Sequence, residues 1–320
     1  ILLIGFGGIG IRHAIVLLKK YDSQITIVDP QIKRERLEQI SQYEERYEIY
    51  PSINKINEFN EYKLVVVACN THYHDDILIK LFNQRFPGKI LVEKPLTADP
   101  GKLKNLSFRQ DQVMINYCRR YHLPYQRIKE YYKSNKDSIK SVFISCGCAG
   151  FFMLISHYLD VISFITDDFT IYPTYSDLIN LDYENVRGPQ FQDFAGTIIF
   201  NSKKSNLRIF IDCSNDLGTP PFIRFQGGCE VIEFSEIDGS LIFYKRNSDV
   251  INEPLNRYNY PLNKVEQNIY KLEIPLLLEM AYQDLLGSFS IGCNWEQGLI
   301  NANVLLRALP SEKRKDLILA

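Results

Sequence analysis

The feature that most constrains this chain is a glycine-rich stretch between an apolar run and a helical pattern. The sequence opens with ILLIGFGGIG, continues with the helical pattern IRHAIVLLKKY, and then reaches a second strand pattern, QITIVDP. In such a unit the first glycine permits a tight bend, the second lets the backbone approach a pyrophosphate, and the third allows close helix–strand packing. Free N–H groups at the helix N-terminus favour a bound phosphate. We therefore expect a dinucleotide-binding turn, with a ligand-free βα turn as the alternative. The residues expected to bind the cofactor here are Gly5, Phe6, Gly7, Gly8, Ile9 and Gly10.

An acidic residue ends the second strand pattern. Asp29 lies 19 residues beyond Gly10, close to the spacing of about 20 for the residue that binds the ribose hydroxyls. A carboxylate accepts hydrogen bonds from those hydroxyls and repels a 2′-phosphate. We expect NAD as the cofactor. NADP is the less favoured alternative, left open by the basic residues Lys33, Arg34 and Arg36.

Strand and helix patterns continue to alternate over the first part of the chain. KLVVVACNTHYHDD and GKILVEKPLT each read as a buried strand followed by a polar turn. Alternation of this kind predicts a doubly wound parallel sheet, so residues 1–120 are expected to form an α/β Rossmann domain. Ligands bind at the C-terminal ends of such strands. The side chains expected at those ends, besides the glycine turn and Asp29, are Cys69, Asn70, Glu93 and Lys94.

The later sequence has a different pattern. IKSVFISCGC, GTIIFNSKKSNLRIFIDCS and RFQGGCEVIEFSEIDGSLIFYK predict strands joined by polar hairpin turns, and FFMLISHYLDVISFI has helical spacing. Residues 121–320 are therefore expected to form an α+β domain with a large, mostly antiparallel sheet, whose terminal helix is free to pack back on the first domain. One face of that sheet is expected to meet another subunit, in a homodimer or homotetramer.

Composition narrows the functional classes. The chain has 45% hydrophobic and 23% charged residues, with 37 basic and 38 acidic side chains. This balance gives little support to a nucleic-acid surface. No apolar run approaches the roughly 18–20 residues of a membrane span, and nothing resembles a signal peptide. Seven cysteines at irregular spacings favour reduced thiols in a cytoplasm.

Two pairs of residues have spacings that suggest metal ligands. Cys146 and Cys148 form a CxC pair at the end of a predicted strand, and His72 and His74 are also one residue apart. A metal site needs further ligands at a defined spacing, and no second pair accompanies either one. We expect no metal, free thiols at the cysteines, and a structural or cofactor-edge role for His74.

Taken together, GFGGIG, ACNTHYH, EKPL and HYLD resemble the Gfo/Idh/MocA oxidoreductases, named for glucose–fructose oxidoreductase and inositol dehydrogenase. The resemblance is strongest over residues 1–125. It implies a dehydrogenase or reductase that transfers hydride between a nicotinamide and the hydroxyl or keto carbon of a sugar or nucleotide-linked sugar. It gives the catalytic roles to Lys94 and His157, which would flank the reacting hydroxyl. It implies that Glu93 stabilises the lysine charge or contacts the nicotinamide ribose.

The chain departs from the family pattern before His157. Family members usually have an aspartate three or four residues earlier, where this chain has Leu154 and Met153. Asp160 shares the helix face but lies one turn beyond. Three alternatives therefore stay open: a core histidine, a dinucleotide- or sugar-binding sensor or assembly subunit, and a reductase of an imine or a tetrapyrrole. The residues expected to bind substrate are Lys94, Arg120, Met153 and His157, with Arg119 and Arg120 also candidates for bridging the two domains.

Overall fold

The computed structural model describes residues 1–56, 58–135, 139–147, 150–181, 191–214, 220–247, 262–314 and 317. These residues divide into two compact units. The first contains Ile1–Tyr121 and Glu273–Asn303, and the second contains His122–Leu272 and Val304–Leu317. The sequence placed residues 121–320 in the second domain and left its terminal helix free to pack back on the first, and the contacts of residues 273–303 place them in the first unit.

The first unit is built on a seven-stranded sheet with the strand order β15-β6-β5-β4-β1-β2-β3. Its strands pair in parallel except β15, which is antiparallel to β6. This is the Rossmann-type sheet that the sequence predicted. The strands are β1 (Leu2–Ile4), β2 (Ile25–Val28), β3 (Tyr47–Tyr50), β4 (Leu64–Val67), β5 (Lys89–Val92), β6 (Val113–Ile115) and β15 (Cys293–Asn294).

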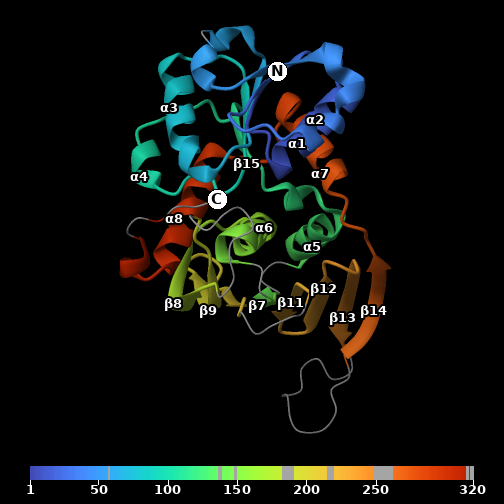
Figure 1. Ribbon diagram of the computed structural model, residues 1–320. Helices are drawn as coiled ribbons and strands as arrows, with labels where there is room; N and C mark the ends of the chain where they lie inside the picture. The colour runs from blue at the N-terminus through green and yellow to red at the C-terminus, as the bar shows by residue number, and fades with distance from the viewer. Residues whose placement is uncertain are drawn as a thin grey trace. The chain divides into compact units, whose positions relative to one another are not determined.

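Helices cover this sheet because its central strands are apolar on both faces. All four residues of β4 are buried, as expected of β-branched strands in a parallel sheet. Val65 and Val67 share a core with Leu78 and Leu81 of α3. Helix α7 lies beside α1 in Figure 1, although more than 250 residues separate them in the chain. The helices are α1 (Gly8–Lys20), α2 (Arg34–Glu38), α3 (His74–Asn83), α4 (Pro100–Leu103), α7 (Ile274–Leu286) and α8 (Trp295–Ala308), the last of which ends in the second unit.

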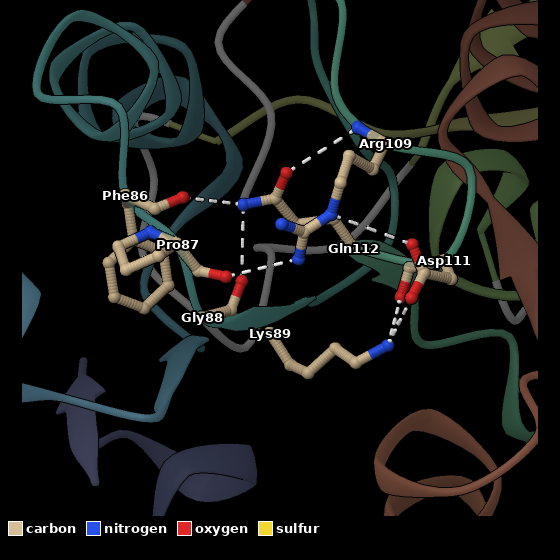
Figure 2. Close-up of polar contacts among 7 residues, drawn as sticks. All are labelled: Phe86, Pro87, Gly88, Lys89, Arg109, Asp111 and Gln112. Carbon is tan, nitrogen blue, oxygen red and sulfur yellow. Dashed lines mark hydrogen bonds and ion pairs between the residues drawn. The ribbon is translucent and has the colours of Figure 1, made fainter.

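A set of polar contacts fixes the N-terminal ends of β5 and β6 (Figure 2). The buried amide of Gln112 donates through Nε2 to the carbonyl oxygens of Phe86, at 2.6 Å, and Gly88, at 3.1 Å. Lys89 Nζ donates to Asp111 Oδ2 at 2.8 Å. These bonds lie at the edge of the sheet opposite the strand ends where ligands bind in such folds. We therefore assign them to holding β5 and β6 in register.

The second unit contains an eight-stranded sheet with the order β14-β13-β12-β11-β7-β10-β9-β8. Its pairs are antiparallel except β7 with β10. A large, mostly antiparallel sheet was predicted, and it is confirmed. The strands are β7 (Ile139–Ser145), β8 (Ile171–Asn180), β9 (Phe194–Ser202), β10 (Arg208–Asp212), β11 (Phe222–Gly227), β12 (Glu230–Ser235), β13 (Ser240–Arg246) and β14 (Leu262–Ile269).

The two faces of this sheet have different surroundings. On one face, α5 (Leu123–Ser134) and α6 (Ser156–Thr166) pack together over the strands. Tyr125 of α5, for example, meets Phe234 of β12 with ring centroids 5.2 Å apart. On the other face, Phe143 of β7 stacks on Phe210 of β10 at 4.7 Å and remains 39% exposed. The outer face is thus partly aromatic and open within the described chain.

No helix among the described residues is long and apolar enough to cross a membrane.

Candidate dinucleotide-binding site and catalytic residues

Two glycines of the first turn are required by close backbone contacts. Gly5 has a φ of +96°, and a Cβ there would lie 2.5 Å from the backbone nitrogen of Cys69. A Cβ on Gly10 would lie 2.2 Å from the carbonyl oxygen of Gly5. Any larger residue at either position would push β1, α1 and the end of β4 apart. These contacts place the N-terminus of α1 directly over the end of β1.

Gly7 and Gly8 occupy open space instead. A Cβ at either position would meet no described atom within 4 Å. Gly7 caps α1 without a side-chain hydrogen bond, and the first turn of the helix has no acidic residue. The amide groups of this turn are therefore suited to an anion, and the space beside them suits the pyrophosphate of a dinucleotide.

Asp29 is tied to the same turn. Its Oδ2 accepts a hydrogen bond from the Phe6 amide at 2.6 Å, and its Oδ1 accepts one from the Gln31 amide at 2.7 Å. Each carboxylate oxygen retains a second lone pair for a ribose hydroxyl. Among the basic residues noted in the sequence, Arg36 donates through Nη1 to the Phe6 carbonyl at 2.8 Å. That arginine is therefore part of the turn.

The ends of β4 and β5 are joined by His74. Its ring is buried, with Nε2 3.1 Å from the Cys69 carbonyl oxygen and Nδ1 3.2 Å from that of Leu96. Burial lowers the pKa of His74, so its ring is suited to donating one bond as a neutral group. Burial also raises the pKa of the Cys69 thiol to about 12. Asn70 precedes the short helix Thr71–Tyr73 and is half-buried beside these groups.

Glu93 and Lys94 follow β5 at the same edge. Lys94 is half-buried, and the peptide bond between it and Pro95 is cis. Glu93 is buried, and its Oε1 accepts hydrogen bonds from His13 Nε2 at 2.8 Å and from Asn116 Nδ2 at 2.5 Å. Burial alone would raise the pKa of Glu93, but these bonds and the charge of Lys94 hold it below its ordinary value. A carboxylate therefore persists next to the lysine.

Three residues around Glu93 were missed at the sequence level. His13 lies on α1 and Asn116 follows β6. Tyr282 lies on α7, and its hydroxyl oxygen is 2.6 Å from His13 Nδ1. His13 follows the glycine turn within an apolar helical face, and that single polar residue was the available signal. Nothing in the local sequence around Tyr282 indicated that α7 reaches this unit.

Arg120 has contacts that explain its burial. It is 1% exposed, and Nη1 donates to the carbonyl oxygens of Ile291 and Gly292 and to Gln297 Oε1 at 2.9–3.2 Å. It holds the segment around β15 in place within the first unit, to which Arg120 and this segment both belong. A contact of Arg120 with substrate, and the domain-bridging role considered for it and for the buried Arg119, stay predictions.

His157 lies on the predicted helix, but that helix begins differently from the expectation. Residues Phe151–Ile155 form a π turn, and the regular α-helix starts at Ser156. The predicted helical segment is present, and its first turn is a π turn of which the sequence showed no sign. His157 and Asp160 are 8% and 2% exposed, while Met153 is half-buried.

A carboxylate from elsewhere caps this π turn. Asp193 is buried, and it accepts hydrogen bonds from the amides of Phe152, at 2.8 Å, and Met153, at 3.2 Å. A Cβ on Gly150, whose φ is +78°, would lie 2.2 Å from Asp193 Oδ2. The pairing of Gly150 with Asp193 thus fixes the start of the helix that carries His157.

The candidate metal ligands are dispersed. Cys146 is a free, buried thiol whose Sγ is 3.6 Å from the Asp212 carbonyl oxygen, and Cys148 lies outside the described residues. The His72 ring packs on that of Tyr73, with centroids 3.8 Å apart. In the part of the chain that the structure describes, no three His, Cys, Asp or Glu side chains are grouped to hold a metal ion.

The glycine geometry generates a paired prediction. Gly7→Ala should leave the free energy of unfolding within about 1 kcal/mol of the parent, since the new methyl meets no protein atom and glycine-to-alanine changes at compatible positions are mild. It should weaken NAD binding by about tenfold or more, because the methyl occupies the phosphate space. Gly10→Ala should instead lower thermal stability strongly. Thermal unfolding and NADH fluorescence titration measure both effects, and unchanged NADH affinity in Gly7→Ala would contradict the assignment.

The comparisons with known proteins agree with this geometry. Residues 1–113 match the family model of the oxidoreductase family with an NAD-binding Rossmann fold, Gfo/Idh/MocA. No curated protein matches the chain.

Solved structures match over nearly the whole length. UDP-N-acetylglucosamine 3-dehydrogenase from Acidithiobacillus ferrooxidans is 16% identical, with a TM-score of 0.67 over 96% of this chain and 95% of that one. Myo-inositol dehydrogenase from Lactobacillus casei, solved with NAD(H) and myo-inositol, is 16% identical, with a TM-score of 0.67 over 98% and 94%. The transcriptional regulator Gal80p from Kluyveromyces lactis is 13% identical, with a TM-score of 0.69 over 95% and 87%. At such identities these likenesses establish the fold. The family match thus concerns the first part of the chain, in which residues 1–113 are similar to the NAD-binding Rossmann fold of the Gfo/Idh/MocA oxidoreductases.

Proposed function

We propose that the protein is an NAD-dependent dehydrogenase or reductase that acts on a hydroxyl or keto carbon of a sugar or nucleotide-linked sugar. The observation that carries this proposal is the buried Glu93 carboxylate beside Lys94, at the strand-end edge that also holds the glycine turn and Asp29. The sugar class is supported by two structural neighbours, which are dehydrogenases of UDP-N-acetylglucosamine and of myo-inositol.

The proposed chemistry divides between two side chains. The nicotinamide, when bound, supplies the group that accepts or donates hydride. Lys94, with a carboxylate as neighbour, donates a hydrogen bond to the reacting oxygen as an ammonium. His157, on the helix of the second unit, accepts or returns the hydroxyl proton, because an imidazole changes its protonation near neutral pH.

A second candidate function rests on Met153. Without the usual aspartate before His157, the protein would bind dinucleotide or sugar as a sensor or an assembly subunit. The likeness to Gal80p, a transcriptional regulator with the same fold, favours this candidate over a reductase of an imine or a tetrapyrrole. The two leading candidates differ in whether any sugar is turned over.

The first prediction concerns the cofactor. NADH should bind more tightly than NADPH, because the Asp29 carboxylate faces the position of the ribose hydroxyls and repels a 2′-phosphate. Asp29→Ala should narrow the difference between the two affinities. Protein fluorescence titration with both reduced cofactors measures it. Tighter binding of NADPH by the parent protein would refute the NAD assignment.

The second prediction concerns catalysis. Lys94→Ala and His157→Ala should each lower turnover by about 10²–10⁴, the usual contribution of a positioned acid–base group. The double variant should be little worse than the poorer single one, because residues that act as a unit are not additive. NADH should still bind to all three, since the glycine turn is intact. Turnover is assayed with a panel of sugars and nucleotide sugars by following the absorbance of NADH.

The exposed Lys104→Ala is the matched control and should leave turnover unchanged. If His157 is a core histidine, its replacement lowers the melting temperature and leaves turnover per folded molecule intact. Absence of turnover with every sugar, while NADH binds, favours the sensor.

The third prediction concerns assembly. We propose that the outer face of the second sheet, around Phe143 and Phe222, packs against a second copy of the chain in a homodimer or homotetramer. These two side chains are 39% and 38% exposed within the described chain, and a partly aromatic sheet face is seldom left in water. Phe143→Glu should shift the oligomer toward monomer in light scattering, whereas Lys104→Glu should not. A parent protein that is monomeric at micromolar concentration would overturn this proposal.

A further inference from the structure

A buried polar network lies behind the strand end that carries Lys94. Its four members, here called the Glu93 network, come from four separate segments of the first unit. None of the four residues is more than 7% exposed. The members are His13 of α1, Glu93 after β5, Asn116 after β6 and Tyr282 of α7.

The directions of its hydrogen bonds follow from which groups can donate. The hydroxyl of Tyr282 is fully buried 2.6 Å from His13 Nδ1, and burial raises the pKa of the phenol well above its ordinary value. The phenol therefore stays protonated and is hydrogen-bonded to Nδ1. Because the Glu93 carboxylate can only accept, His13 carries a proton on Nε2, which donates to Glu93 Oε1 at 2.8 Å. The Tyr282 hydroxyl thus orients the imidazole ring that donates to the carboxylate.

The carboxylate of Glu93 meets donors at both of its oxygens. His13 and Asn116 each donate an N–H group to Oε1, and the Lys94 amide approaches Oε2 at 3.4 Å. A buried carboxylate is stable only when its lone pairs are satisfied and positive charge lies close. The contacts of His13 and Asn116, together with the Lys94 ammonium, favour the ionised carboxylate. Other ionisable groups that face the network are His74, from the side of α3, and Tyr21, whose ring lies 6.2 Å from that of Tyr282.

We propose that His13 and Tyr282 are positioning residues, which hold Glu93 as the fixed counter-charge of Lys94 and thereby keep the lysine an ammonium. This inference rests on the proposed function, in which Lys94 donates to the reacting oxygen. It also gives the C-terminal segment a role at the site, because α7 brings Tyr282 to His13 across 269 residues of sequence.

The test measures Lys94 itself and needs no substrate. Purified protein without added cofactor is treated with limiting acetic anhydride from pH 7 to pH 10, and acetylation of the Lys94 peptide is followed by mass spectrometry. Only the free amine reacts, so the pH profile reports the lysine pKa. Lys94 is half-buried, and exposed lysines such as Lys104 provide an internal reference.

Glu93→Gln should raise the acetylation rate of Lys94 at pH 8 by about tenfold, the effect of one pKa unit. Tyr282→Phe should raise it by about threefold, because loss of one neutral hydrogen bond weakens the hold on the carboxylate. Tyr21→Phe is the matched control, since it removes a phenol from the same aromatic pair and leaves His13 Nδ1 untouched. It should leave the rate unchanged.

Two results would overturn the inference. If Glu93→Gln, folded by circular dichroism, leaves the Lys94 rate within twofold of the parent, the carboxylate is not the counter-charge of the lysine. If Glu93→Gln raises the Lys94 acetylation rate as expected, while Tyr282→Phe gives the same rate as Tyr21→Phe, then His13 and Tyr282 contribute only packing and do not position the carboxylate. Should Tyr282→Phe fail to fold, His13→Gln replaces it. Its flexible amide can reach Glu93 but does not hold the fixed position of the imidazole ring, so the same threefold rise in the Lys94 acetylation rate is expected.

The outcome is separable from that of the proposed function. A shifted Lys94 profile without turnover of any sugar supports the Glu93 network and points to the sensor. If turnover depends on Lys94 but the pH profile of Lys94 acetylation is unshifted in Glu93→Gln, the proposed enzyme is supported. The Glu93 network then has no part in its mechanism.

Discussion

The first unit depends on one close backbone approach, at which α1 crosses the end of β1. With 2.2 Å between the Gly5 carbonyl oxygen and the position of a Cβ on Gly10, only glycine allows the helix to start so close to the strand. That approach determines where the amides of Gly7 and Gly8 point. The bond from the Phe6 amide to Asp29 then fixes the turn to the end of β2. The phosphate-binding and ribose-binding parts of the candidate site are therefore joined by direct backbone contacts.

The same approach brings His13 over the end of β5. From Gly8 to His13 is less than two turns of α1, so the helix that offers its N-terminus to a phosphate also presents an imidazole to Glu93. The proposed cofactor site and the proposed support of Lys94 are thus joined through one short helix. Tyr282 extends this arrangement to α7, which is part of the segment 273–303 that belongs to the first unit.

The parts of this structure that could be predicted from the sequence are those set by local rules. Glycine spacing and β-branched runs define β1, β2, β4 and β5, and hairpin patterns define the second sheet, so both fold classes followed. The Glu93 network could not be predicted in the same way, because its members are joined only by tertiary contacts. His13 and Tyr282 each look like single polar residues on apolar helices until both are seen around one carboxylate. The π turn before His157 was missed for a similar reason, since its cap, Asp193, is 40 residues away in sequence from Met153.

That cap bears on the choice between enzyme and sensor. The family aspartate is absent from the helix, yet a carboxylate is present at its start, because Asp193 binds the amides of Phe152 and Met153. Both of its oxygens accept from the backbone, so Asp193 fixes the start of the helix that carries His157. In the proposed enzyme, Met153 cannot make the polar contact with substrate that an aspartate would make. The proposed proton transfer through Lys94 and His157 does not chemically depend on that contact, whereas substrate affinity and selectivity do. This argument favours an enzyme with altered substrate preference over a protein that has lost its chemistry.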